Sequence, residues 1–362
     1  MITRRNFTLG LTAGAATLAT STSALGAFKK TGQSATQRAF IFDAMGEIRD
    51  VYTDSLIAEI IDSGLNAIAV TLCDPKTFEQ EAFDVTLAGI REYDRIIKDN
   101  SNFYLKATSV SDIERARAQN KIAIFYLTQN STHIGRDLDK IDLFYSLGQR
   151  VCQITYNYQN WAGSGCKEKN GSGLTKFGHE LVEKLNDTNM LIDLSHANMR
   201  TMADVAKASK QPVHISHTCA MALFENERNT TDENMRAVAD TGGVVGICQM
   251  RPFMTHEKKD VLHVYFEHIE HAIKVAGVDH VGIGSDRDHR RLNMTPEYIA
   301  ELKREEGANF NDKEWPLYFE ELNGPRRMEV IWEGLKKRGH SNTTLEKVFG
   351  DNMLRLYRDV VG

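Results

Sequence analysis

The sequence predicts one α/β domain folded as a TIM-like (β/α)8 barrel. After residue 35, short apolar runs rich in β-branched residues alternate with amphipathic segments of helical period. This alternation is typical of a parallel sheet covered by helices. Eight or nine such units fit a closed barrel better than an open sheet. No G-x-G-x-x-G follows the first run, which disfavours a dinucleotide-binding fold.

The strands are expected at the apolar runs, because a strand buried on both faces has no polar side. These runs cover residues 39–43, 67–72, 103–108, 122–127, 151–156, 191–196, 212–217, 243–248 and 280–286.

The helices are expected between these runs, where apolar residues recur three and four positions apart. His263, His268 and His271 lie on the last of these segments, and we expect them at the surface. The helical segments cover residues 53–63, 87–100, 137–147, 176–186, 199–207, 232–241 and 263–276.

The C-terminal third departs from this rhythm. Residues 294–324 are polar and helix-like, and in a barrel enzyme such a segment forms a lid or insertion. Residues 325–338 and 343–359 are predicted to be the closing helices.

The N-terminus has the pattern of a twin-arginine export signal. Arg4 and Arg5 are followed by Phe7, by a weakly apolar run over residues 10–19, and by small residues ending at Gly26. The run is too short to span a bilayer, so no stable membrane anchor is expected. We therefore expect a signal peptide over residues 1–26, a linker over 27–38, one barrel domain over 39–362, and a periplasmic location.

Composition excludes some classes of partner. The net charge is −5, with 41% hydrophobic and 26% charged residues and no basic stripe, so nucleic acid is not an expected partner. The chain has five cysteines. Cys73 and Cys166 lie in loop-like contexts and could pair in an oxidising compartment, but spacing does not fix connectivity.

Three polar side chains end predicted strands, where barrel enzymes place their active sites. His196 and His217 end two consecutive runs, and Asp286 ends a later one. Two histidines at the ends of neighbouring strands can reach one metal ion, and a carboxylate facing them can carry a proton. His214 lies along the same run as His217 and is interpreted as packing.

Six segments stand out together: Asp193–His196, Ile215–His217, Arg228–Asn229, Gly277–Asp286, Lys337–His340 and Val348–Asn352. In combination they resemble the membrane dipeptidases (renal dipeptidase), binuclear zinc enzymes of the amidohydrolase superfamily, and the resemblance runs from about residue 39 to the end. It implies a metal-dependent hydrolase barrel in which His196 and His217 bind zinc, Asp286 handles the proton and Arg228 holds a substrate carboxylate.

The sequence also departs from that family's pattern. Met45 and Glu47 stand where the first strand of the family has a histidine and an aspartate that bind zinc. Gln129 aligns with the bridging glutamate, and Tyr156 with a histidine that polarises the substrate. A glutamine carries no charge to offset two cations, and methionine is a weak zinc ligand. We therefore expect one divalent ion per chain, with zinc as the favoured metal. His196 and His217 are its expected ligands, and Gln129, Glu47 or water would complete the coordination.

Three functions remain open at this point. The first is a mononuclear hydrolase that cleaves an amide in a small carboxylate-bearing substrate such as a dipeptide, with substrate contacts from Arg228 and Tyr156. The second is a barrel with changed chemistry (a lyase, an isomerase or another hydrolase), in which Tyr156 and the charged cluster at 287–291 take over lost roles. The third is a non-catalytic periplasmic binding protein. The expected partner is a small molecule or dipeptide, and homodimer formation is left open.

Overall fold

The structure is a computed structural model that describes residues 36, 39–306, 311 and 313–362. The expected signal peptide and nearly all of the expected linker lie outside the described residues. Among the described helices, none is long and apolar enough to cross a membrane.

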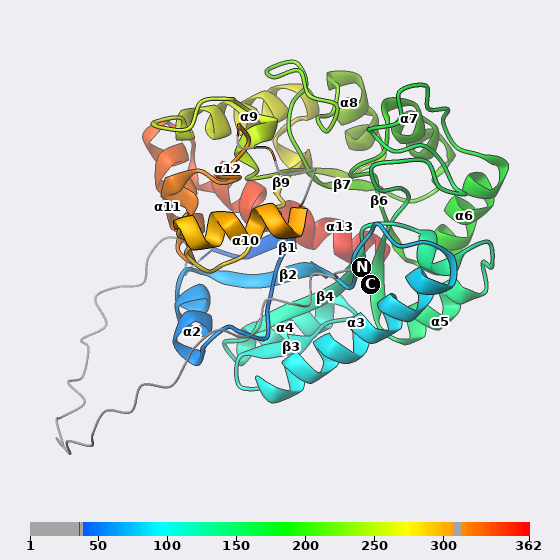
Figure 1. Ribbon diagram of the computed structural model, residues 1–362, viewed down its shortest axis with the longest axis horizontal. Helices are drawn as coiled ribbons and strands as arrows, with labels where there is room; N and C mark the ends of the chain where they lie inside the picture. The colour runs from blue at the N-terminus through cyan, green and yellow to red at the C-terminus, as the bar shows by residue number, and fades with distance from the viewer. Residues whose placement is uncertain (1–35, 37–38, 307–310, 312) are drawn as a thin grey trace.

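Eight parallel strands form a closed barrel, which confirms the predicted fold class (Figure 1). The order around the barrel is β1, β2, β4, β5, β6, β7, β8, β9 and back to β1, and the β2–β4 pairing closes the ring. A ninth strand, β3, pairs beside the first half of β4. The bounds are β1 Ile41–Gly46, β2 Leu65–Thr71, β3 Tyr104–Lys106, β4 Ile122–Thr128, β5 Gln149–Gln153, β6 Leu191–Asp193, β7 His214–Thr218, β8 Val244–Ile247 and β9 Val281–Ile283.

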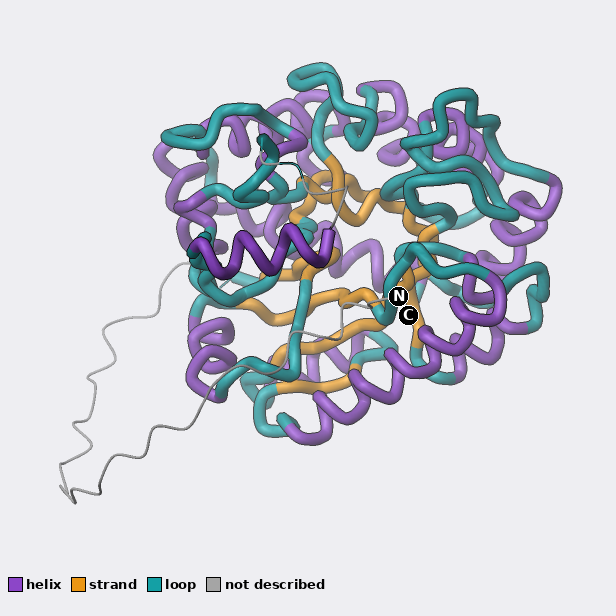
Figure 2. Tube along the Cα trace, viewed as in Figure 1, coloured by secondary structure: helices purple, strands orange, loops and turns teal. Residues whose placement is uncertain are grey.

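Helices surround this ring of strands (Figure 2). Apolar periodicity did not predict α4, whose start is marked instead by a capping box between Ser109 and Asp112. The helices are α2 Asp54–Asp62, α3 Glu79–Asp99, α4 Val110–Ala118, α5 Lys140–Ser146, α6 Lys176–Asp187, α7 Met199–Ala208, α8 Asp232–Asp240, α9 Leu262–Ala276, α10 Pro296–Glu306, α11 Arg327–Lys337, α12 Asn342–Glu346 and α13 Asn352–Val360.

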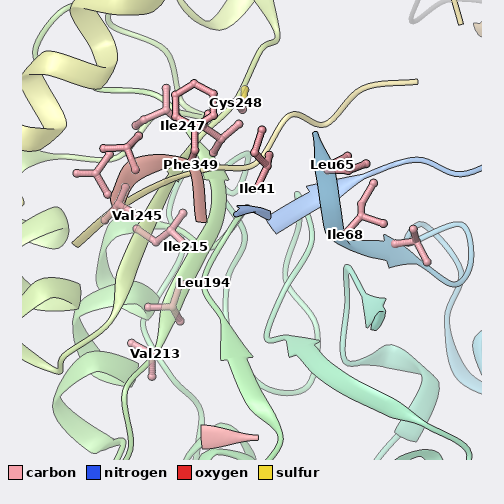
Figure 3. Packing of buried hydrophobic residues seen from close by; sticks show 14 of the residues in the cluster. Ile41, Leu65, Ile68, Leu194, Val213, Ile215, Val245, Ile247, Cys248 and Phe349 are labelled. Carbon is pink, nitrogen blue, oxygen red and sulfur yellow. The ribbon is translucent and has the colours of Figure 1, made fainter. Parts of the chain in front are cut away.

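The barrel buries apolar side chains on both sides of its wall. Residues such as Ile41, Ile215 and Ile247 pack outward against the helices (Figure 3). Phe42 and Phe125 belong to a second cluster, where Tyr357 of α13 packs against them with ring centroids 4.6 and 4.7 Å apart.

Helix α13 closes the amino end of the barrel. Arg355 donates to the carbonyls of Gly242 and Asp279, which lie two residues before β8 and β9. The carboxyl end is therefore the end that remains for the site.

One expectation for the histidines of α9 is wrong. His268 is fully buried, and its Nδ1 accepts a hydrogen bond from the Ala220 N–H at 2.9 Å. His263 is exposed and His271 is partly buried. The amphipathic pattern of α9 did not show that the loop after β7 covers its inner edge.

Candidate functional site

The predicted rim residues all come from the carboxyl ends of their strands. His217 lies within β7, while His196 and Asp286 each lie three residues beyond β6 and β9. His196 and Asp286 have left-handed backbones, with φ of 62° and 54°, an uncommon conformation for residues other than glycine. Each is anchored by its backbone: Cys166 N–H donates to His196 O at 2.7 Å, and Asp286 N–H donates to Met45 O at 2.8 Å.

His196 and His217 face each other across a short gap. Their Nε2 atoms lie 3.1 Å apart, and both residues are buried. Two imidazole nitrogens that bind one zinc ion at about 2.0–2.1 Å lie roughly 3.3 Å apart in a tetrahedral site. The pair is therefore spaced as a chelating pair is.

The electrostatic setting keeps the His217 ring neutral. Burial, with smaller contributions from the nearby Arg228 and His214, lowers the pKa of His217 well below its usual range. A neutral ring has one nitrogen with a free electron pair, which is what a metal ion needs. His214 is fully buried, in accord with its interpretation as packing.

Tyr156 lies directly against this pair. Its ring centroid is 4.2 Å from that of His196, with the planes tilted by 31°. The position aligned with a substrate-polarising histidine is thus beside the site, although the role of the hydroxyl stays a prediction.

Arg228 is a buried cation that contacts the backbone of His217. Its Nη2 donates to His217 O at 2.8 Å, and only 4% of the residue is exposed. Within the part of the chain that the structure describes, its Nε and Nη1 have no hydrogen-bond partner. Unmade hydrogen bonds of a buried charged group are costly, so these donors suit an anionic ligand.

Comparison with known proteins shows the family to which this chain belongs. The family model for membrane dipeptidases (Peptidase family M19) matches residues 47–304. The chain belongs to the membrane dipeptidase family. An uncharacterized dipeptidase of Schizosaccharomyces pombe is 33% identical over 286 residues, which are 77% of this chain and 61% of that relative. The chain thus spans less than two thirds of the length of this curated relative.

Solved structures show the same barrel. An amidohydrolase from Pseudomonas aeruginosa superimposes with a TM-score of 0.78 and 28% identity, covering 90% of this chain and 98% of that one. A metallo peptidase from Rhodobacter sphaeroides gives 0.74 and 18%, covering 89% and 99%. The second, at this identity, supports the fold alone.

The remaining expected metal ligands do not complete a family-like cluster. Glu47 forms an ion pair with Arg49, which also binds Asp288 Oδ2 at 2.9 Å. Met45 is fully buried in β1, and Gln129 is buried just after β4. Among the described residues, no group of three or more His, Cys, Asp or Glu side chains is placed to hold a metal ion. The histidine pair has the spacing of two ligands of one ion, and the number of ions per chain stays a prediction.

The charged cluster at 287–291 is engaged in internal contacts. Asp288 accepts from Arg290 Nε at 2.9 Å and from the Tyr52 hydroxyl at 2.7 Å. His289 is buried, with its Nε2 3.2 Å from Arg327 Nη2. These contacts hold the segment after β9 and do not favour a replacement catalytic role for it.

Sequence reasoning missed the side chains that hold the histidines. Asn157 Oδ1 lies 2.7 Å from His196 Nδ1, and Ser216 Oγ lies 2.7 Å from His217 Nδ1. The Asp193 carboxylate lies beneath Ser216. Ser216 directly precedes His217, and Asp193 stands three residues before His196 in the quoted motifs, so a search of the polar residues just before each histidine could have found both. Asn157 comes from a separate loop and left no such signal.

The two cysteines of the expected loop pairing have different neighbours. Cys73 Sγ lies 3.2 Å from Thr86 Oγ1, and Cys166 Sγ lies 3.7 Å from Asn157 Oδ1. They are not joined to each other.

The metal content of the purified protein follows from this donor set. We expect elemental analysis to find at most one tightly held divalent ion per chain, because Met45 and Gln129 supply neither the nitrogen nor the charge of a second site. The matched contrast is Met45→His with Gln129→Glu, which should raise the zinc content above that of the wild type. Two tightly bound ions in the wild type would contradict the expectation.

Proposed function

We propose that this chain is a metal-dependent hydrolase that cleaves an amide bond in a small, carboxylate-bearing substrate such as a dipeptide. The main observation behind this proposal is the facing pair of histidine Nε2 atoms beside Arg228, whose Nε and Nη1 have no hydrogen-bond partner among the described residues. The Pseudomonas relative is named an amidohydrolase. The Rhodobacter enzyme was solved with a phosphinate mimic of the dipeptide L-Ala-D-Ala. The family and the name of the Pseudomonas relative favour amide cleavage over the lyase and isomerase alternatives.

In this proposal His196 and His217 would hold one divalent ion, with zinc as the favoured metal, and Gln129, Glu47 or water would complete its ligands. Such an ion would supply Lewis acidity, which polarises a carbonyl group and makes water a better nucleophile near neutral pH.

Asp286 moves the proton. Its carboxylate accepts the proton of the attacking water and returns it to the nitrogen of the leaving amine. Arg228 binds the substrate carboxylate through Nε and Nη1 while Nη2 stays on His217 O. The Tyr156 hydroxyl donates to the oxygen on which negative charge develops.

The proposal includes export. Arg4, Arg5 and the weakly apolar run that follows support passage through the twin-arginine route into the periplasm. Fractionation of cells that express the full chain, with Arg4→Lys and Arg5→Lys together as the blocked control, tests it. Periplasmic recovery of the control at the wild-type level would refute this route.

The activity is tested with a panel of dipeptides and N-acyl amino acids. We expect the zinc-loaded protein to cleave members with a free carboxylate, and a chelator to abolish cleavage. Their amidated counterparts should react poorly, since Arg228 then has no anion to bind. Binding of these compounds without any cleavage would instead identify a non-catalytic binding protein.

Arg228→Lys should raise KM for the best substrate with little change in kcat. A lysine offers one point charge where the guanidinium offers a planar fork. Loss of one charged hydrogen bond of about 1.5–3 kcal/mol corresponds to roughly a 10- to 100-fold rise in KM. Arg236→Lys is the control, because Arg236 is exposed and forms an ion pair with Asp232 of the same helix, α8. An unchanged KM for Arg228→Lys would exclude this assignment.

A further inference from the structure

A buried line of hydrogen bonds runs from β6 to the ring of His217. The Ser216 hydroxyl donates to Asp193 Oδ2 at 2.6 Å, and His217 Nδ1 lies 2.7 Å from the same hydroxyl oxygen. Asp193, Ser216 and His217 are all completely buried. Figure 1 shows the two strands, β6 and β7, side by side in the barrel wall.

The direction of each hydrogen bond follows from the donors available. Both Asp193 oxygens accept: Oδ2 from the Ser216 hydroxyl, and Oδ1 from the N–H groups of Ser195 and Ser216 at 3.0 and 2.9 Å. Ser216 has one hydroxyl proton, and it is used in the hydrogen bond that the hydroxyl donates to Asp193 Oδ2. Ser216 Oγ can then only accept from His217, so the His217 proton is on Nδ1.

A third contact fills the hydrogen-bonding capacity of the Ser216 hydroxyl oxygen. Ser195 Oγ lies 3.0 Å from Ser216 Oγ and accepts the His217 N–H at 3.0 Å. Because the Ser216 proton is already used, the Ser195 hydroxyl is the donor in that contact. Ser216 Oγ therefore donates once and accepts twice, which is its full capacity. With the Asp193 carboxylate as the acceptor of the Ser216 proton, His217 Nδ1 is left as the donor in its contact with Ser216 Oγ.

The consequence is a free electron pair on His217 Nε2, aimed at His196. His196 Nδ1 faces the carbonyl oxygen of Asn157 at 2.7 Å and so donates to it. The Nε2 atom of His196 then also presents an electron pair, and the two pairs face each other across 3.1 Å. Two such pairs repel unless a proton or a metal cation lies between them.

We propose that Asp193 and Ser216 are positioning residues that hold His217 in its Nδ1–H tautomer, so that its Nε2 can bind a divalent cation together with His196. The identity of the cation rests on the proposed function, whereas the tautomer does not. Neighbours that orient a metal-binding histidine typically change metal affinity about 10- to 100-fold when they are removed. That is the size of effect we expect here.

The first readout needs no metal. Protein with 15N-labelled histidine should give long-range 1H–15N spectra at pH 8 in which His217 is the Nδ1–H tautomer. In Ser216→Ala the acceptor of Nδ1–H is lost, so the population should shift toward Nε2–H. Asp193→Asn is the second variant: an amide can donate to Ser216 Oγ, which frees the Ser216 proton to point at Nδ1. If Ser216→Ala fails to fold, Asp193→Asn tests the same hydrogen-bond network.

The second readout is the dissociation constant for Zn2+ itself, measured by competition with a chromogenic chelator. Ser216→Ala and Asp193→Asn should each bind Zn2+ about 10- to 100-fold more weakly than the wild type. Ser63→Ala is the matched control, because it also removes a buried serine hydroxyl, one that donates to Ile60 O at 2.8 Å at the end of α2 and is not part of the network around His217. It should bind Zn2+ within a few-fold of the wild type.

The outcomes separate the two proposals. An Nε2–H tautomer of His217 in the wild type, or wild-type Zn2+ affinity in both variants, would overturn the positioning role. A wild type that binds no Zn2+ would overturn the proposed function and the cation-binding part of this inference. The Nδ1–H tautomer in the same sample would then still establish the hydrogen-bond network that fixes it.

Discussion

Asp286→Asn is expected to lower kcat roughly 100- to 10,000-fold, the usual contribution of a general acid–base group. Asparagine has almost the same shape but cannot take the proton of the attacking water. The fold should tolerate the change, because Asp286 has a left-handed backbone with φ of 54° and asparagine adopts that conformation readily. Turnover of the best dipeptide and the melting temperature are the two measurements.

The matched control is Asp260→Asn. Asp260 has a similar left-handed backbone, with φ of 56°, but is exposed in the loop before α9. It should keep full activity and a wild-type melting temperature. Zinc content must be measured on each variant, so that lost proton transfer is separated from lost metal. Near-full activity of Asp286→Asn at normal zinc content would end the proposed role.

The barrel could be predicted because its strands are buried on both faces. Each of the nine apolar runs overlaps one strand, although the runs that end at residues 156, 196 and 286 extend three residues beyond β5, β6 and β9. Helix α4 was not predicted, because it is short and its apolar residues form only a weakly amphipathic face. The sequence signal for this helix was the capping box at Ser109 rather than apolar periodicity. Burial of His268 depends on a loop that packs on α9 from elsewhere in the chain.

The site was predictable only where it follows the strands. His196, His217 and Asp286 were found because the ends of parallel strands meet at one rim. The groups that orient them depend on contacts across the fold: Asn157 reaches His196 from 39 residues away. Such contacts leave no mark in local spacing.

The largest effect on stability is expected at a buried ion pair that the sequence did not suggest. Arg327, at the start of α11, is almost fully buried and lies 3.5 Å from Asp43 Oδ2 in β1. It also donates to Ser285 Oγ and Asp288 O, each at 3.2 Å. Asp43 Oδ1 in turn accepts the Ser285 N–H at 2.7 Å. The pair thus ties β1, α11 and the residues on both sides of Asp286 together.

Arg327→Met should lower the free energy of unfolding by about 3–5 kcal/mol at pH 7, because it leaves the Asp43 carboxylate buried without its cation. Burial already raises the pKa of Asp43 above its ordinary value of 3.8, and Arg327 opposes this rise. Without Arg327 the pKa rises further, so the folded state binds the proton more tightly than the unfolded chain does. The deficit should therefore shrink as the pH falls toward 3.8 from the raised pKa.

Urea unfolding at pH 7 and pH 5 measures this prediction, with two comparisons. Arg338→Met removes a cation at the end of the same helix, but Arg338 pairs with Glu270 at the surface, where both side chains are about one-third exposed. That change should cost at most about 1 kcal/mol. Adding Asp43→Asn to Arg327→Met removes the unpaired charge and should recover part of the loss at pH 7, because the penalty comes from the isolated carboxylate rather than from the missing arginine alone. A loss no larger than that of Arg338→Met, or one that does not change with pH, would contradict this account of the pair.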